Sequence, residues 1–306
     1  MTIRDAIKLA RCNHWIKNVF VLMPVVFGMK MTSPQAWVDA LIATGAFCFA
    51  SSFAYVINDI KDRENDRLHP RKKDRPIASG RMSVKQAAVE AAVLLVGAGG
   101  VAYSRSFVLL VVVGIYLLLQ VCYSNFLKYM VLVDVISIAM GFVIRATAGA
   151  VAIGVEISPW LFICMFTLCL FLGFCKRYNE LATLGNAENA GSHRRTLLSY
   201  TPDLLTHLIT LSAGITVVGF LLYSLNERTV DHFGTNMFIY TLPLVIYAIC
   251  RFAMLSMKGS YSDPTDLILH DKPFQLTLLL WFFASVLIIV WGPKIQCCIE
   301  GIGDAV

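Results

Sequence analysis

The sequence predicts an all-α membrane protein, a polytopic bundle of transmembrane helices. Only 15% of the 306 residues are charged, whereas a soluble domain carries about 25%. Hydrophobic residues make up 57% of the chain. Nine apolar stretches approach the length of about 20 residues that a helix needs to cross the hydrocarbon core of a bilayer. These values exclude a disordered chain, a secreted disulfide scaffold and an ordinary soluble enzyme.

The nine predicted spans follow one another along most of the chain. The first is short and contains Pro24, and the third contains three glycines that allow close helix contact. The stretch before the first span is charged and has the pattern of an amphipathic surface helix, not of a signal peptide. The expected spans are 16–30, 36–57, 84–104, 106–125, 130–153, 158–175, 203–224, 236–256 and 274–293.

Lysine and arginine residues collect on one side of these spans. That side receives the N-terminal stretch and the loops over 58–82, 176–200 and 257–273. The positive-inside rule places it, and the N-terminus with it, in the cytoplasm. Loops of up to about 25 residues are long for simple connections, so we expect them to cap an active site. The whole chain, residues 1–306, is expected to form a single transmembrane catalytic domain.

An acidic motif directly follows the second span. Read as a helix, Asp59, Asp62 and Asp66 fall within about 60° of one another on one face. Carboxylates this close repel one another, and a divalent cation removes the repulsion. Oxygen ligands suit Mg²⁺, which commonly bridges carboxylates to substrate phosphates. Basic residues that follow are candidates for holding a further phosphate: Arg67, Arg71, Lys72, Lys73, Arg75 and Arg81.

The alternative explanation of this segment is a solvated loop that obeys the positive-inside rule. It accounts for the eight lysine and arginine residues of 58–82, but not for the five acidic residues among them. The sequence therefore favours a metal and phosphate site over a plain connecting loop.

The pattern Asn58-Asp59-x-x-Asp62-x-x-x-Asp66 resembles the first Asp-rich motif of the UbiA superfamily of intramembrane prenyltransferases. In that family the motif ends a transmembrane helix and binds Mg²⁺ and a diphosphate. The stretch that follows, through Arg75, also matches, and the resemblance covers almost the whole chain. It implies a UbiA-like bundle of nine helices, with the three aspartates as metal ligands and catalytic residues and Asn58 orienting them.

The loop after the sixth predicted span departs from the family pattern. Most members carry a second Asp-rich motif there, but this chain has one carboxylate, Glu180, with the cations Lys176 and Arg177. One metal-binding face and one cationic face suit a metal-bound diphosphate and a bare phosphate. This arrangement resembles the decaprenyl-phosphate phosphoribosyltransferase branch of the superfamily. Further matches are Arg11-x-x-x-Trp15-Ile16-Lys17-Asn18, Tyr123-Ser124-x-x-Leu127-Lys128, Asp134, the run from Gly141 to Ala150 with Arg145, Tyr178, and Arg194-Arg195.

Members of this branch join 5-phosphoribosyl 1-diphosphate to a polyprenyl phosphate and release diphosphate. The resemblance implies the same Mg²⁺-dependent transfer here, with a product that feeds arabinose-containing cell-wall glycolipids or related ribose transfer. It implies a protein of the bacterial cytoplasmic membrane. Its expected partners are polyprenyl phosphate, the ribosyl donor and membrane lipids, with no nucleic acid. A homo-oligomer is one of the assemblies that the sequence allows. The residues expected to bind substrate are Asn58, Lys17, Asn18, Arg67, Arg75, Tyr123, Lys128, Asp134, Arg145, Lys176, Arg177, Tyr178, Glu180, Arg194 and Arg195.

Two ionisable residues, Asp134 and Arg145, lie inside a predicted span, where an unpaired charge costs several kcal/mol. They are about 16 Å apart along a helix, so they are not simple partners of one another. We expect Asp134 to orient Lys128 at the cytoplasmic mouth. For Arg145, a structural pair across helices and a place in the cavity lining explain the charge equally well.

Two other functions stay as alternatives. A conventional UbiA-type prenyltransferase moves a prenyl group from a prenyl diphosphate to an aromatic or other acceptor, and the aspartate motif fits it too. The cationic loop after span six favours phosphoribosyl transfer instead. A transporter is expected to carry polar residues along several spans and helices broken at the midplane. In this sequence the polar residues concentrate at the cytoplasmic ends.

Overall fold

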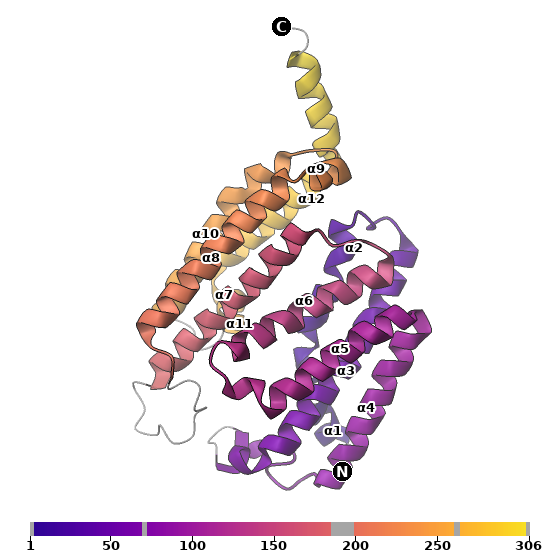
Figure 1. The fold of residues 1–306 in the computed structure, drawn as a ribbon, viewed down its shortest axis with the longest axis vertical. Helices are drawn as coiled ribbons and strands as arrows, with labels where there is room; N and C mark the ends of the chain where they lie inside the picture. Colours follow the sequence, from indigo (N-terminus) through magenta and orange to yellow (C-terminus); the bar gives the residue numbers. More distant parts are fainter. Residues whose placement is uncertain (1–2, 69–71, 185–198, 260–263, 304–306) are drawn as a thin grey trace. The chain divides into compact units, whose positions relative to one another are not determined.

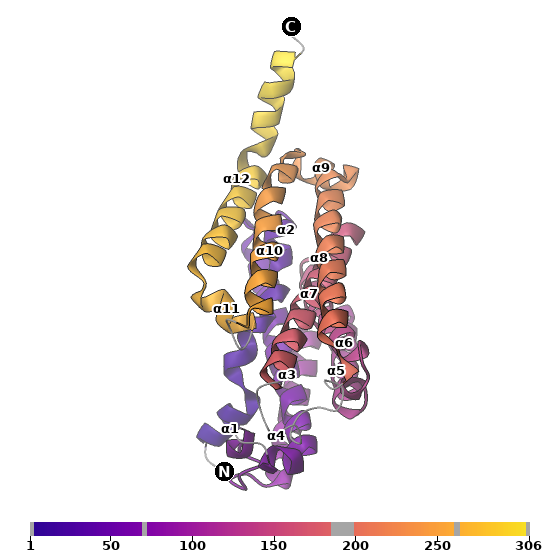
Figure 2. The ribbon, with the colours of Figure 1, turned by 90° about the vertical axis from the view of Figure 1, so that its left-hand side faces the viewer.

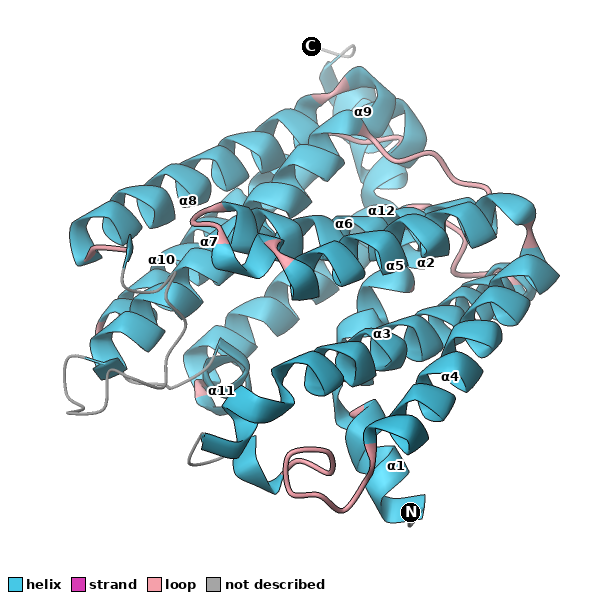
Figure 3. Ribbon diagram, turned by 60° about the horizontal axis from the view of Figure 1, so that its bottom comes forward, coloured by secondary structure: helices cyan, strands magenta, loops and turns pink. Residues whose placement is uncertain are grey.

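In the computed structural model, helices are the only regular secondary structure of the described residues, which are 3–68, 72–184, 199–259 and 264–303; loops and turns connect them (Figure 3). Eight of its helices are long and apolar enough to cross a membrane. The chain is therefore a multi-pass membrane protein, as predicted. Its helices fall into two compact units.

The first unit is built on the N-terminal half of the chain, Met1–Glu156. Its elements are α1 (Ile3–Ala10), η1 (Cys12–Val21), α2 (Met23–Phe27), α3 (Pro34–Leu68), η2 (Lys72–Asp74), α4 (Val84–Arg105), α5 (Phe107–Asn125), η3 (Leu127–Tyr129) and α6 (Val133–Ile153). The long helix α3 packs against α4, α5 and α6 (Figure 1). The 3₁₀ segment η1 packs against α3 and α6, so it lies inside this unit.

The second unit holds the C-terminal helices, within Ile157–Glu188 and Leu197–Val306. Its elements are α7 (Pro159–Leu184), α8 (Pro202–Leu225), α9 (Glu227–Phe233), η6 (Met237–Thr241), α10 (Leu242–Met257), α11 (Pro264–His270) and α12 (Lys272–Gly303). Helix α7 packs along α8, and α10 contacts α7, α8 and α12. The last turns of α12 extend beyond α8 and α10 (Figure 2).

Eight of the nine predicted spans correspond to these long helices. The clearest difference is at the end of α3, where the apolar run stops at Ile57 but the helix continues to Leu68. Charged residues such as Lys, Arg and Glu are good helix formers, so the loss of hydropathy does not end the helix. The acidic motif is therefore helical, as its spacing predicts.

The predicted first span, 16–30, does not form a single helix. Cys12–Val21 is a 3₁₀ helix, and Met23–Phe27 is an α-helix of little more than one turn. The segment is fastened sideways to α3, since Trp15 Nε1 donates a hydrogen bond to Ser52 Oγ at 3.0 Å. Within the described residues the structure thus has eight candidate spans, where the sequence predicts nine.

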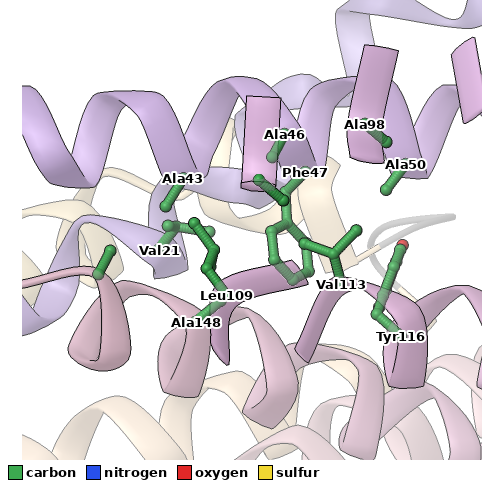
Figure 4. Close-up of a cluster of buried hydrophobic side chains, with 12 residues drawn as sticks. Val21, Ala43, Ala46, Phe47, Ala50, Ala98, Leu109, Val113, Tyr116 and Ala148 are labelled. Carbon is green, nitrogen blue, oxygen red and sulfur yellow. The ribbon is translucent and has the colours of Figure 1, made fainter. Parts of the chain in front are cut away.

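Small residues allow close packing in the core of the first unit. The rings of Phe47 in α3 and Tyr116 in α5 lie 5.0 Å apart between centroids, and alanines of the neighbouring helices surround them (Figure 4). The tightest approach is between α6 and η1 at Gly149. A Cβ atom on Gly149 would stand only 1.9 Å from the carbonyl oxygen of Val21. Only glycine fits there without a backbone shift.

We therefore expect Gly149→Ala to destabilise the protein by about 1–3 kcal/mol or more, the usual cost of overpacking. The matched control is Gly114→Ala in α5, where an added Cβ meets no atom within 4 Å. That change removes a helical glycine and is expected to be neutral or stabilising by up to about 1 kcal/mol. Thermal unfolding in detergent measures both, and equal melting temperatures for the two variants would contradict this packing.

Candidate active site

The acidic motif occupies the last three turns of α3, where buried and exposed positions alternate around the helix. Asp59 and Asp66 are buried, with relative exposures of 2% and 4%, and Asp62 is half-buried. Their common face is the one predicted from the i, i+3, i+7 spacing. A buried carboxylate needs hydrogen bonds and a counter-charge, because desolvation of an ion is costly. The structure supplies both for each aspartate.

Asp59 is held by two arginines from different parts of the first unit. Arg11 Nη2 lies 2.5 Å from its Oδ1 atom, and Arg75 Nη1 lies 3.0 Å from the same oxygen. Arg75 Nη1 also lies 2.6 Å from Oδ2 of Asp66. Arg75 therefore bridges two aspartates that are two helical turns apart. The expected substrate-binding residue Arg75 is thus part of the acidic cluster itself.

Asp62 has a different cation as its partner, Lys128 of η3. The Lys128 ammonium lies 2.6 and 2.9 Å from the two carboxylate oxygens of Asp62 and 3.4 Å from Oδ1 of Asn58. A second lysine, Lys61, donates to the side-chain and main-chain oxygens of Asn125 at 2.6 and 3.1 Å. Five polar contacts thus join the end of α3 to the end of α5 and to η3.

This pairing changes one expectation. From the sequence, a divalent ion is expected to relieve repulsion among the three aspartates, but each of them already has an arginine or lysine partner. Among the described residues, no group of three His, Cys, Asp or Glu side chains is placed to hold a metal ion alone. The donor chemistry still fits Mg²⁺, which usually takes one or two carboxylates together with substrate phosphates. We therefore infer that this cluster suits a metal ion that arrives with phosphate groups.

Arg11 is the site residue that sequence reasoning does not single out, although it lies in the matched stretch 11–18. Its backbone is left-handed, with φ 51° and ψ 49°, which is uncommon for a residue with a side chain. Its guanidinium also lies 4.9 Å from the ring centroid of Tyr55. The sequence signal for Arg11 is its spacing from Trp15 and Asn18. In the structure these three side chains contact Asp59, Ser52 and Ser51 of α3, in this order away from its acidic end.

Arg145 forms a buried network with neutral partners. Its Nε donates to Oδ1 of Asn18 at 2.9 Å, and its Nη2 donates to the Tyr116 hydroxyl at 2.7 Å. Its Nη1 donates to the Gly141 carbonyl at 3.1 Å, and the guanidinium lies 5.1 Å from the ring centroid of Phe142. Within the described part of the chain these contacts include no carboxylate. Arg145 therefore makes structural contacts across helices, with neutral groups of the described chain and not in an ion pair, and a place for it in the cavity lining stays a prediction.

The remaining predicted residues of the first unit are more scattered. Arg67 is exposed and pairs with Glu64 at 3.0 Å, away from the common face of the aspartates. Asp134 is fully buried in the first turn of α6. Lys17 in η1 and Tyr123 near the end of α5 are half-buried. Their roles in substrate binding stay predictions.

The predicted cationic loop of the second unit begins inside a helix. Lys176, Arg177, Tyr178 and Glu180 all belong to the last turns of α7. Arg177 is buried and pairs with Glu180 one turn away. Asn179, which is not among the residues predicted from the sequence, is buried beside them. The predicted residues Arg194 and Arg195 lie outside the described residues.

The predicted loop 257–273 contains α11 and a fixed ion pair. Asp271 accepts hydrogen bonds from Nε and Nη2 of Arg251 at 2.6 and 2.9 Å, and from the backbone N–H of Phe274 at 2.9 Å. It therefore caps α12. The Arg251 guanidinium holds the pKa of Asp271 below its usual range. These contacts give Asp271 a structural role, and a place for this loop in an active-site cap stays a prediction.

The fold and the site together define the class of protein. It is an all-helical, multi-pass membrane protein with ion-paired acidic and basic side chains at one end of a membrane helix. The chain belongs to the UbiA prenyltransferase family, whose model matches residues 21–270.

Relatives from two bacterial genera, Corynebacterium and Mycobacterium, are similar over most of this chain. A decaprenyl-phosphate phosphoribosyltransferase of Corynebacterium glutamicum is 34% identical over 293 residues, covering 94% of this chain and 87% of the relative. Another of that name, from Mycobacterium tuberculosis, is 33% identical over 284 residues, covering 91% and 92%.

Solved structures share the fold. A UbiA homolog from Archaeoglobus fulgidus bound to DMAPP and Mg²⁺ has a TM-score of 0.72 and 18% identity, covering 94% of this chain and 99% of that one. The apo structure of a UbiA homolog from Aeropyrum pernix K1 has a TM-score of 0.59 and 15% identity, covering 97% and 99%. The predicted UbiA-like helical fold is thereby confirmed.

The Arg145 network yields a prediction about stability. Tyr116→Phe keeps the ring but removes the hydroxyl that accepts from the guanidinium, so we expect a loss of about 1.5–3 kcal/mol, typical of a hydrogen bond to a charged group. Tyr103→Phe is the control, since Tyr103 is 66% exposed. Thermal unfolding of the two variants is the measurement. Unfolding of Tyr116→Phe at the temperature of the unmodified protein would show that the network contributes nothing.

Proposed function

We propose that this protein transfers 5-phosphoribose from 5-phosphoribosyl 1-diphosphate to a polyprenyl phosphate of the decaprenyl type and releases diphosphate. The observation that carries the proposal is the 33% and 34% identity, over nine-tenths of the chain, to relatives named for this transfer. The cluster at the end of α3 supports it with the required chemistry, because it offers carboxylates for a metal ion and cations for phosphate oxygens.

Asp59, Asp62 and Asp66 are the residues that we assign to Mg²⁺ binding. Fold relatives solved with Mg²⁺ support a divalent ion in this family. When bound with the diphosphate, the ion neutralises the leaving group and so lowers the barrier to cleavage of the C1–O bond.

The chain's own cations complete the site for the donor. We assign Arg75 and Lys128 to the diphosphate oxygens, with Asn58 orienting Lys128 through their 3.4 Å contact. Guanidinium and ammonium groups form strong, charge-assisted hydrogen bonds with phosphate. Tyr123 and Tyr178 are assigned to hydrogen bonds with ribose or phosphate.

The acceptor is the lipid phosphate, which is already an anion at neutral pH. One of its oxygens forms a bond to C1 of the ribose while the bond from C1 to the diphosphate breaks, through an oxocarbenium-like state. The reaction therefore needs no general base. Asn18 and Arg145 are assigned to the positioning of η1. The further residues that we assign to the lipid phosphate and to the completion of the site are Lys17, Arg67, Asp134, Lys176, Arg177, Glu180, Arg194 and Arg195.

We place the protein in a bacterial cytoplasmic membrane with the acidic end of α3 facing the cytoplasm. The support is the positive-inside rule, because the basic residues of 58–82 surround that end. The polyprenyl tail would then lie among the apolar helices, and the water-soluble ribosyl donor would enter from the cytoplasm.

The direct experiment incubates the purified protein with Mg²⁺, radiolabelled 5-phosphoribosyl 1-diphosphate and polyprenyl phosphate. We expect label to appear in the lipid fraction. We expect Asp62→Asn to lower the rate at least about tenfold at ordinary Mg²⁺, because a metal ligand is weakened. Asp39→Asn is the matched control, since Asp39 lies near the other end of α3 and pairs with Arg105 at 2.8 Å.

One outcome would overturn the proposed reaction, and a second would overturn the metal role of Asp62. Label that stays in the aqueous fraction, while a prenyl diphosphate is consumed with an aromatic acceptor, would identify a conventional prenyltransferase. Full activity of Asp62→Asn at ordinary Mg²⁺ would remove that aspartate from metal binding.

A further inference from the structure

The metal ligand proposed at the centre of the cluster, Asp59, has one of its two carboxylate oxygens occupied by arginines. Oδ1 of Asp59 lies 2.5 Å from Nη2 of Arg11 and 3.0 Å from Nη1 of Arg75. Asp59 itself is only 2% exposed. A Mg²⁺ ion binds a carboxylate oxygen at about 2.0–2.1 Å. An ion on this oxygen would therefore stand against two guanidinium groups of the same sign.

A metal ion that arrives alone faces two costs. It is repelled by the two arginines at close range, where the protein screens charge less than water does. If it displaces them, they lose the partner that offsets their partial burial, since their side chains are only 19% and 23% exposed. Asp62 is closed to a metal in a similar way, because both of its oxygens contact the Lys128 ammonium.

A diphosphate removes both costs when it arrives with the metal. Its oxygens are good acceptors for guanidinium groups, which match phosphate with two parallel hydrogen bonds. The arginines can then exchange the Asp59 carboxylate for the diphosphate, and the carboxylate becomes available to the ion.

We propose that Arg11 and Arg75 are exchange residues: they occupy Asp59 until a diphosphate arrives, and then pass from the carboxylate to the diphosphate. Metal and diphosphate therefore bind together, and neither binds tightly alone. This inference depends on the proposed function in one respect only: the donor substrate must carry a diphosphate. It makes Arg11 a substrate-binding residue, beyond those predicted from the sequence.

The backbone of Arg11 supports this role. Its left-handed conformation is costly for a residue with a Cβ atom, and such strain persists only where surrounding contacts enforce it. The side chain of Arg11 is held by the Asp59 ion pair and the Tyr55 ring, and we take these contacts to enforce the left-handed conformation. Release from Asp59 thus frees a residue that is already under strain, which eases the exchange.

The test measures binding, not turnover, with the full chain in detergent. Radioactive Mn²⁺ serves as the metal probe in equilibrium dialysis, with and without inorganic diphosphate, and a protein-free chamber corrects for the metal–diphosphate complex in solution. We expect diphosphate to tighten Mn²⁺ binding at least about tenfold. Thermodynamic linkage requires Mn²⁺ to tighten the binding of radiolabelled diphosphate by the same factor.

Two variants locate the coupling. In Arg75→Gln and in Arg11→Gln, we expect Mn²⁺ alone to bind at least about tenfold more tightly, because one competing positive charge is gone. The enhancement by diphosphate should shrink in both. Arg105→Gln is the matched control, since it breaks the pair between Arg105 of α4 and Asp39, near the other end of α3, and should leave both affinities unchanged.

The inference is overturned if the unmodified protein binds Mn²⁺ equally well with and without diphosphate. It is also overturned if neither exchange variant binds Mn²⁺ alone more tightly. Even if a variant does not fold, the binding measurements on the unmodified protein alone show whether diphosphate tightens the binding of Mn²⁺. Because inorganic diphosphate contains no ribose, the coupling can hold even if the phosphoribosyl transfer assay fails, and the two results are separable.

Discussion

The convergence of Arg11 and Arg75 on one oxygen of Asp59 is the interaction on which the arrangement of the first unit depends. The two arginines lie 48 and 16 residues away from Asp59 in the sequence. They fasten the N-terminal segment and the stretch after α3 to the end of a membrane helix. Removing one member of such a buried set leaves an uncompensated charge, which costs about 3–5 kcal/mol. The contacts of Arg11 and Arg75 with Asp59 thus stabilise the fold of the first unit, and they also place positive charge beside the acidic motif.

A second buried cation shows how the rest of this unit accommodates charge inside a membrane. Arg145 in α6 is hydrogen-bonded to Asn18 of η1, Tyr116 of α5 and a carbonyl of its own helix. Neutral partners and two aromatic faces replace a carboxylate there. This explains why the apolar stretch near the N-terminus does not form a span of its own: its polar side chains bind α3 and α6 from inside the unit.

The parts of the fold that follow from backbone chemistry can be predicted from the sequence. In lipid every backbone polar group must be paired within the segment, so a long apolar run forms a helix. Eight spans follow from this rule, but the run at 16–30 does not form a single helix. Its Asn18 side chain is hydrogen-bonded to Ser51 of α3 and to Arg145 of α6, contacts that hydropathy alone does not predict. The spacing of Asp59, Asp62 and Asp66 also suffices to place them on one face. Their partners are harder to predict, because many cations are available; only the spacing of Arg11, Trp15 and Asn18 indicates that one of them, Arg11, reaches the acidic end of α3.

The exchange of partners at Asp59 links the fold, the acidic motif and the proposed chemistry. An experimental structure of the protein with Mg²⁺ and diphosphate tests it most directly, through the distance between Arg75 Nη1 and Asp59 Oδ1, which is 3.0 Å here. The account predicts that this distance exceeds about 4 Å, the limit of an ion pair, with the guanidinium on the diphosphate. A distance still near 3.0 Å, with the metal bound elsewhere, would contradict it.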